Sequence, residues 1–322
     1  MPARGTVRRA RSPAFAKVNL GLRVLGRRPD GYHEIRTVFQ SVGFHDRVQV
    51  SFRPGRERRL DLECDHEDLN HEGNLAWRAA DRLMRRMRLD GHVRIRLAKR
   101  IPAGAGLGGG SSDAATVLRL LPALLEEPPS RKALHEVAAA LGSDVPYFLL
   151  GGTVAASGRG TRLAPIRETA PLPIVLVLPD IKVSTEWAYG ALADSRESRL
   201  PSAASWRMLE DVSSERRPLD SEALGRSSEW MLNDFESVVF QRFPALGEIK
   251  RQILACGAHH ALLSGSGSAL FGIFEGPDEA ARAARRLAAE GMQAMPTQSV
   301  SRADCEGAIV IGGEAPGTGS GK

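Results

Sequence analysis

The sequence predicts an α+β fold in which two domains each form two layers of secondary structure. Strand-like and helix-like patterns alternate along the chain, but the strands lack the continuous Val and Ile runs of a buried parallel sheet. At about 150 residues a domain, a chain of 322 residues suffices for two domains. A doubly wound α/β fold is the second possibility, since it also alternates strands and helices.

The predicted strands of the first domain each carry one polar face. Alternation of apolar and polar residues predicts strands over 15–25, 48–52 and 93–97. Such strands are typical of an antiparallel or mixed sheet with one face in water. Helical periodicity covers residues 74–89, 111–125 and 131–141, and Gly142 follows the last of these where a C-terminal cap is expected.

A Pro-rich stretch over 164–173 separates these elements from a second group and is the predicted domain boundary. Beyond it, the patterns predict strands over 174–178, 261–263 and 269–274, and helices over 228–240, 244–255 and 277–290. Residues 193–225 are rich in Ser, Arg, Glu and Pro without periodicity, so we expect a long loop there.

The net charge of +6 and the pI near 9.6 would suit a protein that binds nucleic acid or a membrane surface. Four arginines lie within residues 1–12, which contain no acidic residue, so most of the excess charge belongs to an N-terminal arm. The rest of the chain is nearly neutral, and its aromatic residues (5%) are not interleaved with basic ones. The sequence therefore argues against a nucleic-acid partner.

The short apolar runs argue against a membrane-spanning helix, and the spacing of the cysteines suits a reducing compartment. No apolar run approaches the roughly 20 residues of a membrane-spanning helix. Cys64, Cys256 and Cys305 are far apart and form no C-x-x-C pair, which argues against a disulfide framework or a zinc site. We expect a cytoplasmic protein.

The strongest functional signal is a glycine-rich segment over residues 101–115, I-P-A-G-A-G-L-G-G-G-S-S-D-A-A. Its glycines leave backbone N–H groups open to an anion, and the helix that follows adds its N-terminal dipole, so we expect it to bind nucleotide phosphates. Gly104, Gly106 and Gly109 match the dinucleotide pattern G-x-G-x-x-G, but the preceding strand is half-exposed and no acidic residue follows at a strand end. A Walker loop is rejected too, because no G-K-[ST] follows.

Three further segments carry polar groups, and each has a structural alternative. Lys17 and Asn19 share one strand face, which could simply be wet. Asp144, in G-S-D-V-P, stands where a helix N-cap is expected, with Pro146 just inside the helix. Residues 264–268, S-G-S-G-S, could form a second anion-binding turn or a flexible hairpin.

Four segments resemble, in their order along the chain, the motifs of the GHMP kinases, the family of galactokinase, homoserine kinase and mevalonate kinase. The segments are A-K-V-N-L, P-A-G-A-G-L-G-G-G-S-S, G-S-D-V-P and L-L-S-G-S-G-S. The resemblance implies an N-terminal ATP-binding α/β domain over 13–165 and a C-terminal ferredoxin-like domain over 166–313, with flexible tails over 1–12 and 314–322. The active site would lie in the cleft between the domains, in a monomer or a homodimer.

The resemblance also implies a role for each motif. Asp144 would accept the proton of the attacking hydroxyl, and Lys17 would steady charge on the transferring phosphoryl group and keep Asp144 ionised. ATP would be the phosphoryl donor and would bring Mg²⁺, for which no carboxylate ligand can be named from the sequence. The triphosphate would be held by Pro102, Ala103, Gly104, Ala105, Gly106, Leu107, Gly108, Gly109, Gly110, Ser111 and Ser112.

One branch of the family is matched more closely than the others. The segment R-P-D-G-Y-H-E over residues 28–34 resembles that of kinases acting on a cytidine diphosphate sugar alcohol, in which Tyr32 and His33 would meet the cytidine. Asn19 would lie near the acceptor polyol, and Tyr189 could stack on the base. The substrate would also contact Ser264, Gly265, Ser266 and Gly267. A kinase of the homoserine or mevalonate type is the alternative.

Overall fold

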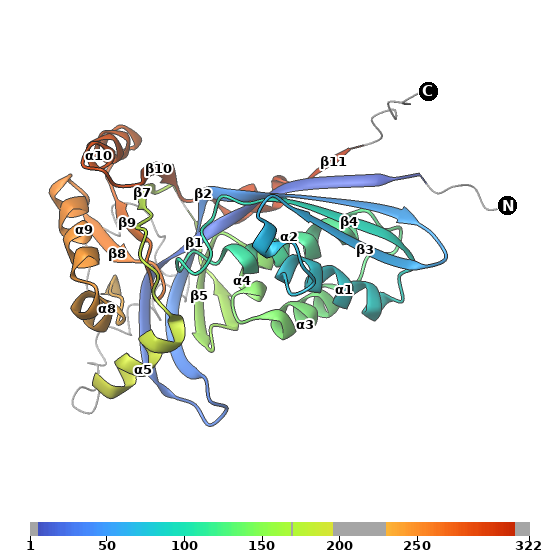
Figure 1. Cartoon of the computed structure of the whole chain (residues 1–322), viewed down its shortest axis with the longest axis horizontal. Helices are drawn as coiled ribbons and strands as arrows, with labels where there is room; N and C mark the ends of the chain where they lie inside the picture. Colours follow the sequence, from blue (N-terminus) through green and yellow to red (C-terminus); the bar gives the residue numbers. More distant parts are fainter. Residues whose placement is uncertain (1–5, 169, 196–229, 313–322) are drawn as a thin grey trace.

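A computed structural model of the chain describes residues 6–168, 170–195 and 230–312. Within these residues the strands form two sheets, one of seven strands and one of four, and helices pack against both (Figure 1). Most neighbouring strands run antiparallel, so the predicted α+β class is confirmed and the doubly wound alternative is wrong.

The larger sheet is built on a long hairpin. β1 (Arg8–Arg27) and β2 (His33–Pro54) pair antiparallel along most of their length. The second half of β2 pairs with β4 (Gly91–Ala98), and β3 (Arg58–Cys64) follows at the sheet edge, parallel to β4. The first half of β2 pairs instead with β5 (Thr153–Gly158), so this strand joins two branches of one sheet.

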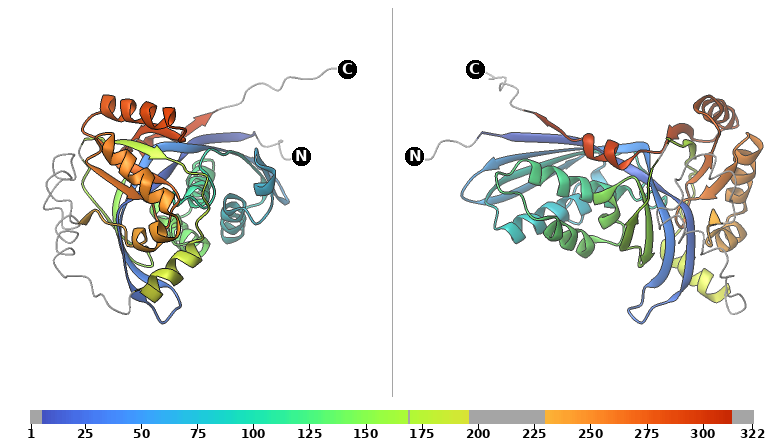
Figure 2. Two further views of the ribbon diagram at one scale, coloured as in Figure 1. Left: turned by 60° about the vertical axis from the view of Figure 1, so that its left-hand side comes forward. Right: turned by 180° about the vertical axis from the view of Figure 1, so that it is seen from behind.

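Two short strands complete the larger sheet. β6 (Arg162–Pro165) pairs with β5. β11 (Val310–Gly312) pairs antiparallel with the start of β1, which brings the last described residues beside the first. Figures 1 and 2 show β11 and the start of β1 together at one end of the molecule.

Four helices cover one face of the larger sheet (Figures 1 and 2). The amphipathic α1 turns its buried alanine and leucine positions toward the sheet, whereas the apolar α2 is buried on nearly all sides and contacts its three neighbours. A single 3₁₀ turn (Glu67–Leu69) precedes them. The four helices are α1 (Leu75–Met87), α2 (Gly109–Ala123), α3 (Arg131–Leu141) and α4 (Val145–Leu150).

The opposite face of this sheet carries polar side chains along β3 and β4. β4 buries Val93, Ile95 and Leu97 under the helices, whereas Arg96 is exposed on the other side. The predicted mixed sheet with one wet face is confirmed for these strands.

The smaller sheet has the strand order β10-β7-β9-β8, with neighbouring strands antiparallel. In chain order this is fourth, first, third, second, the arrangement of a ferredoxin-like domain, as the resemblance implies. Its strands are β7 (Pro173–Val177), β8 (His260–Leu263), β9 (Leu270–Ile273) and β10 (Ala294–Gln298). The helices of this part are α5 (Thr185–Ser195), α8 (Glu236–Arg242), α9 (Pro244–Ala255) and α10 (Pro277–Ala289).

The N-terminal arm is largely part of the sheet. The expected flexible tail over 1–12 is wrong for residues 8–12, which begin β1 and pair with both β2 and β11. Ala10 is 1% exposed, so apolar burial as well as pairing holds the segment. Residues 1–5 and the expected tail over 314–322 lie outside the described residues.

The last described elements lie with the first domain, although the resemblance assigns them to the second. α11 (Arg302–Gly307) is held there by a hydrogen bond from the Arg119 guanidinium to the Cys305 carbonyl oxygen. β11 then joins β1. The chain therefore leaves the first domain after β6 and returns to it after β10.

Several predicted elements differ from the structure. α3, α9 and α10 lie within one residue of their predicted ranges, but the helix expected over 228–240 begins only at Glu236, and residues 228–229 are not described. Residues 193–195 complete α5, and 196–225 of the expected loop lie outside the description. The strands β3, β5, β6, β10 and β11 are not predicted. All of them except β5 are sheet edges, and these four have weak burial patterns.

A buried apolar cluster joins the two domains. Ala16, Val18 and Leu20 of β1 pack with residues of the smaller sheet, such as Leu176 and Phe271. Leu107 of the glycine-rich segment belongs to the same cluster. Since this cluster is continuous across the domain boundary, it fixes the walls of the cleft between the domains. None of the described helices is long and apolar enough to cross a membrane.

Candidate active site

A cavity of about 180 Å³ lies where the two domains meet. We call residues 101–110 the glycine-rich loop and residues 264–268 the serine-glycine loop. Both loops reach the cavity, together with β1, β2 and the start of α4 and α5. The described residues that line it are Lys17, Asn19, Leu22, Ile35, Phe39, Gly106, Gly108, Asp144, Thr185, Tyr189, Phe235, Gly265 and Ser266. The segments predicted to carry the chemistry therefore meet in one place.

Lys17 and Asn19 reach the cavity from an irregular part of β1. Shifts in the β1–β2 register lie on both sides of them, and such bulges bend a strand and redirect its side chains. The two residues are 4% and 2% exposed, so the alternative of a wet strand face is wrong. Lys17 Nζ donates to Asn19 Oδ1 at 2.6 Å, and Asn19 Nδ2 donates to Thr37 Oγ1 at 2.7 Å. This chain of hydrogen bonds fixes the orientation of the Asn19 amide.

Lys17 and Asp144 are the only cation and the only carboxylate among the described residues that line the cavity. Burial lowers the pKa of Lys17, and the negative charge of Asp144 opposes this shift without cancelling it. The positive charge of the Lys17 ammonium group is thus only partly balanced by nearby negative charge in this structure. Oxygen atoms of a bound phosphate would supply it.

Asp144 occupies the N-cap position of α4, but its carboxylate accepts no capping hydrogen bond. The alternative of simple helix capping is therefore wrong, and the carboxylate is left for the cavity. α4 itself is held by the buried Tyr147, whose hydroxyl lies 2.8 Å from Ser41 Oγ and donates to the carbonyl oxygen of Gly152 at 2.9 Å. The position of Asp144 thus comes from the packing of the helix behind it.

Backbone hydrogen bonds from both domains hold the glycine-rich loop. The N–H of Lys17 in β1 donates to the Leu107 carbonyl oxygen at 3.0 Å. The N–H of Ala269, which follows the serine-glycine loop, donates to the Ala105 carbonyl oxygen at 3.1 Å. The loop is therefore fixed by main-chain contacts before any ligand arrives.

Gly106 is the point of closest contact between the two loops. A Cβ atom at this position would lie 1.9 Å from the Ser264 carbonyl oxygen, and its φ of +78° belongs to the left-handed region that favours glycine. Ser264 Oγ donates to the Gly106 carbonyl oxygen at 3.0 Å. Only glycine fits here, so the sequence pattern of the loop follows from its packing.

The start of α2 offers backbone donors to an anion. Its N-cap, Gly108, has no side chain to accept hydrogen bonds from the first turn, so those N–H groups stay free for a ligand. Ser112 differs from its neighbours, because its N–H donates to the Gly108 carbonyl oxygen at 2.9 Å and its Oγ donates to the Phe15 carbonyl oxygen at 2.7 Å. Both of its donors are in use, which removes Ser112 from the residues that can donate to a phosphate.

Behind the loop lies a buried cluster of three charges that the sequence did not reveal. Lys99 Nζ contacts Asp113 Oδ2 at 2.7 Å and also pairs with Asp46. Asp46 accepts the N–H of Ile101 at 2.8 Å and that of Arg100, just before the glycine-rich loop. Asp113 lies on α2, just after it. The cluster therefore ties together both ends of the loop.

The electrostatics of this cluster differ from those at Lys17. Burial alone would lower the pKa of Lys99, but the two carboxylates together raise it. Burial raises the pKa of Asp113 to about 7, helped by the neighbouring Asp46 and opposed by Lys99. Asp113 Oδ1 is buried without a hydrogen-bond partner. The Asp113 carboxylate is therefore buried within this charge cluster.

The serine-glycine loop is supported by Asn233, which sequence reasoning missed. Its Nδ2 donates to the carbonyl oxygens of Leu263 and Gly265, each at 2.7 Å. Ser266 Oγ lies 2.9 Å from Thr185 Oγ1, which links the loop to α5. A single buried asparagine has no spacing pattern, so nothing in the sequence could have identified its contacts.

Aromatic side chains form the far end of the site. The ring of His33 stacks on that of Tyr189, with centroids 4.5 Å apart and planes 19° from parallel. Tyr189 also meets Phe235 edge-on at 4.8 Å. Burial raises the pKa of Tyr189 to about 12, with a contribution from Asp144, so its phenol is neutral. Tyr32 is 52% exposed, with the Arg159 guanidinium 4.6 Å from its ring centre.

The predicted site residues thus divide into two groups. Those that line the cavity are Lys17, Asn19, Gly106, Gly108, Asp144, Tyr189, Gly265 and Ser266. Tyr32, His33, Ser264 and Gly267 do not line it, although His33 stacks on a lining residue and Ser264 supports the glycine-rich loop. The other residues predicted to bind ATP do not line it either: Pro102, Ala103, Gly104, Ala105, Leu107, Gly109, Gly110, Ser111 and Ser112. Lining residues that sequence reasoning missed include Phe39 and Phe235, which carry no chemical signature.

Comparison with known proteins gives a consistent result. Residues 74–152 match the family described as GHMP kinases N terminal domain, and residues 216–293 match GHMP kinases C terminal. The chain is 44% identical over 269 residues to a 4-diphosphocytidyl-2-C-methyl-D-erythritol kinase of Solibacter usitatus, which covers 84% of this chain and 82% of that one. It is 42% identical over 278 residues to the enzyme of the same name from Prosthecochloris aestuarii, with 86% and 93% covered.

Solved structures agree with the sequence relatives. A crystal structure of 4-(cytidine 5'-diphospho)-2C-methyl-D-erythritol kinase matches with a TM-score of 0.72 and 40% identity, over 90% of this chain and 98% of that one. A homoserine kinase from Cytophaga hutchinsonii matches with a TM-score of 0.69 but only 17% identity, over 95% and 97% of the two chains. The second match shows likeness of fold alone.

Proposed function

Because the chain belongs to the GHMP kinases, and within them to the 4-diphosphocytidyl-2-C-methyl-D-erythritol kinases, we propose that it transfers the γ-phosphoryl group of ATP to the 2-hydroxyl of 4-diphosphocytidyl-2-C-methyl-D-erythritol. The products are ADP and the 2-phosphate, in the non-mevalonate route to isoprenoid precursors. The observation that carries this proposal is one cavity with a single cation, a single carboxylate and a preformed glycine-rich loop in its wall.

The glycine-rich loop holds the triphosphate in this proposal. Residues 103–111 supply backbone N–H groups, since Pro102 has none, and the first turn of α2 adds its positive end. Phosphoryl transfer depends mainly on positioning and on stabilising charge on the phosphate oxygens. A loop already fixed by Lys17 and Ala269 suits this task, because little order has to be gained when ATP binds.

Asp144 and Lys17 act on the acceptor and on the transferring group. The 2-hydroxyl oxygen attacks the γ-phosphorus while Asp144 accepts its proton, and the bond to the oxygen between the β- and γ-phosphorus breaks to release ADP. Lys17 faces the same cavity and its buried ammonium stabilises negative charge on the transferring phosphoryl oxygens. We propose that Asn19, which accepts a hydrogen bond from Lys17, contacts the acceptor.

The aromatic end of the site favours a substrate with a flat base. Tyr189 and His33 present stacked rings next to the cavity, and aromatic rings of this kind bind nucleobases by stacking. Homoserine and mevalonate carry no ring that could use this pair. The serine-glycine loop, with Gly265 and Ser266 in the cavity wall, completes the substrate side.

Magnesium is expected to enter with ATP. The described residues contain no group of three or more His, Cys, Asp or Glu side chains that could hold a metal ion. Asp113, the carboxylate nearest the loop in sequence, is paired with Lys99 in the interior. We therefore propose that the phosphates of ATP carry the ion, which keeps several of its waters as Mg²⁺ prefers.

We also place the enzyme in the cytoplasm, where its three free cysteines stay reduced.

A turnover assay with a substrate panel tests the proposed function. ADP release is measured with ATP and either 4-diphosphocytidyl-2-C-methyl-D-erythritol, homoserine or mevalonate. We expect turnover with the cytidyl substrate alone. Turnover with homoserine or mevalonate, and none with the cytidyl compound, would assign the chain to the alternative substrate class.

The variant Asp144→Asn shows whether this carboxylate is the base. It should lower kcat by about 10²–10⁴-fold, since that is the usual contribution of a general base, while an ATP analogue still binds. Asp81→Asn, on α1 and outside the cavity, is the matched control and should keep full activity. Near-normal turnover of Asp144→Asn would remove Asp144 from the reaction.

A further inference from the structure

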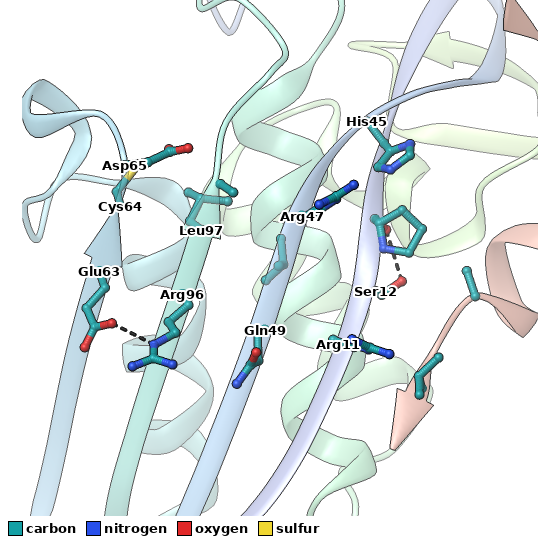
Figure 3. A pocket seen from close by; sticks show the side chains of 15 residues that line it. Arg11, Ser12, His45, Arg47, Gln49, Glu63, Cys64, Asp65, Arg96 and Leu97 are labelled. Carbon is teal, nitrogen blue, oxygen red and sulfur yellow. Dashed lines mark hydrogen bonds and ion pairs between the residues drawn. The ribbon is translucent and has the colours of Figure 1, made fainter. Parts of the chain in front are cut away.

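A second hollow, of about 660 Å³, lies on the face of the larger sheet that faces away from the helices α1–α4 (Figure 3). It shares no lining residue with the catalytic cavity. Its floor comes from β1, β2, β4 and the end of β3. One wall is formed by Val310, the first residue of β11, and by Ala308 just before that strand. A volume of this size falls within the range of about 300–1,000 Å³ typical of ligand pockets.

Strand register places three arginines of this hollow close together. Arg11 of β1 and Arg96 of β4 both pair with Gln49 of β2, so the three form one row across the sheet. Neighbouring strands lie about 4.8 Å apart, so the two arginines begin about 10 Å from each other. Arg47 lies two residues before Gln49 on the strand between them and is therefore diagonal to both. Figure 3 shows all three side chains on this one face.

The positive charges of the hollow are only partly compensated. Arg96 pairs with Glu63 at 2.7 Å, and the Asp65 carboxylate accepts the N–H of Lys99 at 2.9 Å. Arg11 and Arg47 have no carboxylate partner in the part of the chain that the structure describes. All three arginines are exposed, so their guanidinium groups are accessible to a dissolved anion.

We propose that this hollow is a binding site for a small anion with two or more adjacent phosphate groups. Arg11, Arg47 and Arg96 line it on three neighbouring strands, and guanidinium groups bind phosphate oxygens in a bidentate manner. Gln49, at the centre of the row, adds an amide. The site is distinct from the glycine-rich loop, and it does not depend on the proposed kinase function.

The shape of the hollow favours a compact ligand over a nucleic acid. Single-stranded nucleic acids need exposed aromatic rings for stacking, and the only ring among the residues that line this hollow is that of His45. The acidic Glu63 and Asp65 along one edge would repel a polyanion that continued past the three arginines. A short polyphosphate can stay within the basic part.

Calorimetric titration of the full chain with inorganic triphosphate tests the proposal. We expect two binding sites per chain, one at the glycine-rich loop and one in the hollow. In the double variant Arg11→Gln with Arg47→Gln, the second site should weaken by about tenfold for each arginine removed, as expected for hydrogen bonds to charged groups. Turnover should be unchanged, because neither residue lines the catalytic cavity.

Arg82→Gln is the matched control, since it removes the same charge from the exposed side of α1. It should keep both sites. Equal binding of triphosphate by the parent chain and the double variant would overturn the proposal, whether or not the glycine-rich loop also binds triphosphate. Orthophosphate binding as tightly as triphosphate would overturn the requirement for adjacent phosphates. Tight binding of an RNA oligonucleotide that the double variant loses would replace the small anion with a nucleic acid.

Discussion

Two buried lysines of this chain differ in how their charge is balanced. Lys99 is held between Asp46 and Asp113, and these carboxylates more than offset its burial, so its pKa is raised. Lys17 has only the through-space attraction of Asp144, and its pKa is lowered. Lys99 is therefore satisfied within the protein, whereas Lys17 gains stability when a phosphate enters the cavity.

Removing Lys99 should destabilise the fold far more than neutralising Asp113. Lys99→Met leaves two buried carboxylates without their cation, and breaking such a pair costs about 3–5 kcal/mol of unfolding free energy. Asp113→Asn leaves Lys99 paired with Asp46 and should cost little. Urea unfolding of both variants at pH 8 measures the difference. Equal loss in the two variants would show that the cluster does not act as described.

The raised pKa of Asp113 also predicts how the free energy of unfolding depends on pH. The pKa of Asp113 rises from 3.8 to about 7 on folding, so the folded state binds more protons than the unfolded state between these values. The stability of the parent relative to Asp113→Asn should therefore be highest near pH 4, fall as the pH rises to about 7, and stay level above that.

At the residue scale, the sequence could indicate which groups share a face but not what covers them. Lys17 and Asn19 are correctly predicted to lie on one face of a strand. That this face is buried depends on Leu107 and Gly265, which arrive from distant parts of the chain. The pairing of Asp46 with Lys99 and Asp113 is equally non-local, since no spacing rule links residues on β2 and α2.

Among the elements, the glycine-rich loop shows most directly how packing requires a given residue. Gly104 and Gly106 both lie in the left-handed region, with φ of +72° and +78°. Nothing lies within 4 Å of a Cβ at Gly104, whereas one at Gly106 would collide with the Ser264 carbonyl oxygen. Gly104 is therefore required only by its backbone conformation, whereas Gly106 is required also by a close contact.

We expect Gly104→Ala to cost only about 1–2 kcal/mol of stability, the usual penalty for a left-handed L-residue. Gly106→Ala adds a backbone collision that must displace the loop, and a misplacement of about 1 Å can reduce turnover about 100-fold. Steady-state kinetics of both variants, with thermal unfolding as the check on folding, measures the difference. Similar kcat/KM values for the two would contradict the role of the loop contact.

Helices whose ends are marked by local sequence signals are predicted well. Elements that form because they pair or pack with a distant segment are not. α3 and α9 match their predicted ranges because caps and periodicity mark their ends. β10 contains Pro296 and lacks alternation, and it forms a strand only because β7 offers an edge. α5 extends past the point where the sequence loses its periodicity, since its buried side rests on α8.

For the molecule as a whole, the β1–β2 hairpin is the element that connects both domains. Its strands of 20 and 22 residues are much longer than the usual 5–6 residues or so. One end of β1 carries Arg11 in the open hollow, its middle carries Lys17 in the catalytic cavity, and Leu22 near its other end packs in the core of the smaller domain. The arm expected to be a tail is the beginning of this strand.

Deletion of residues 1–12 should therefore destabilise the protein. It removes the pairing of residues 8–12 with β2 and exposes the site of the buried Ala10. Deletion of residues 1–6, which spares β1, is the control and should leave the urea midpoint unchanged. Equal midpoints for the two truncated chains would show that residues 7–12 behave as the expected flexible tail.

The apolar cluster between the domains limits how the chain can be divided. A cut between β6 and β7 would leave Ala16, Val18, Leu20 and Leu107 of the first piece facing water, and the second piece would lose the partner of Leu176 and Phe271. The N-terminal piece would also lose the hydrogen bond from Ala269 that shapes the glycine-rich loop. The two domains therefore form one cooperative unit, and neither half would make a portable nucleotide-binding module for use in another protein.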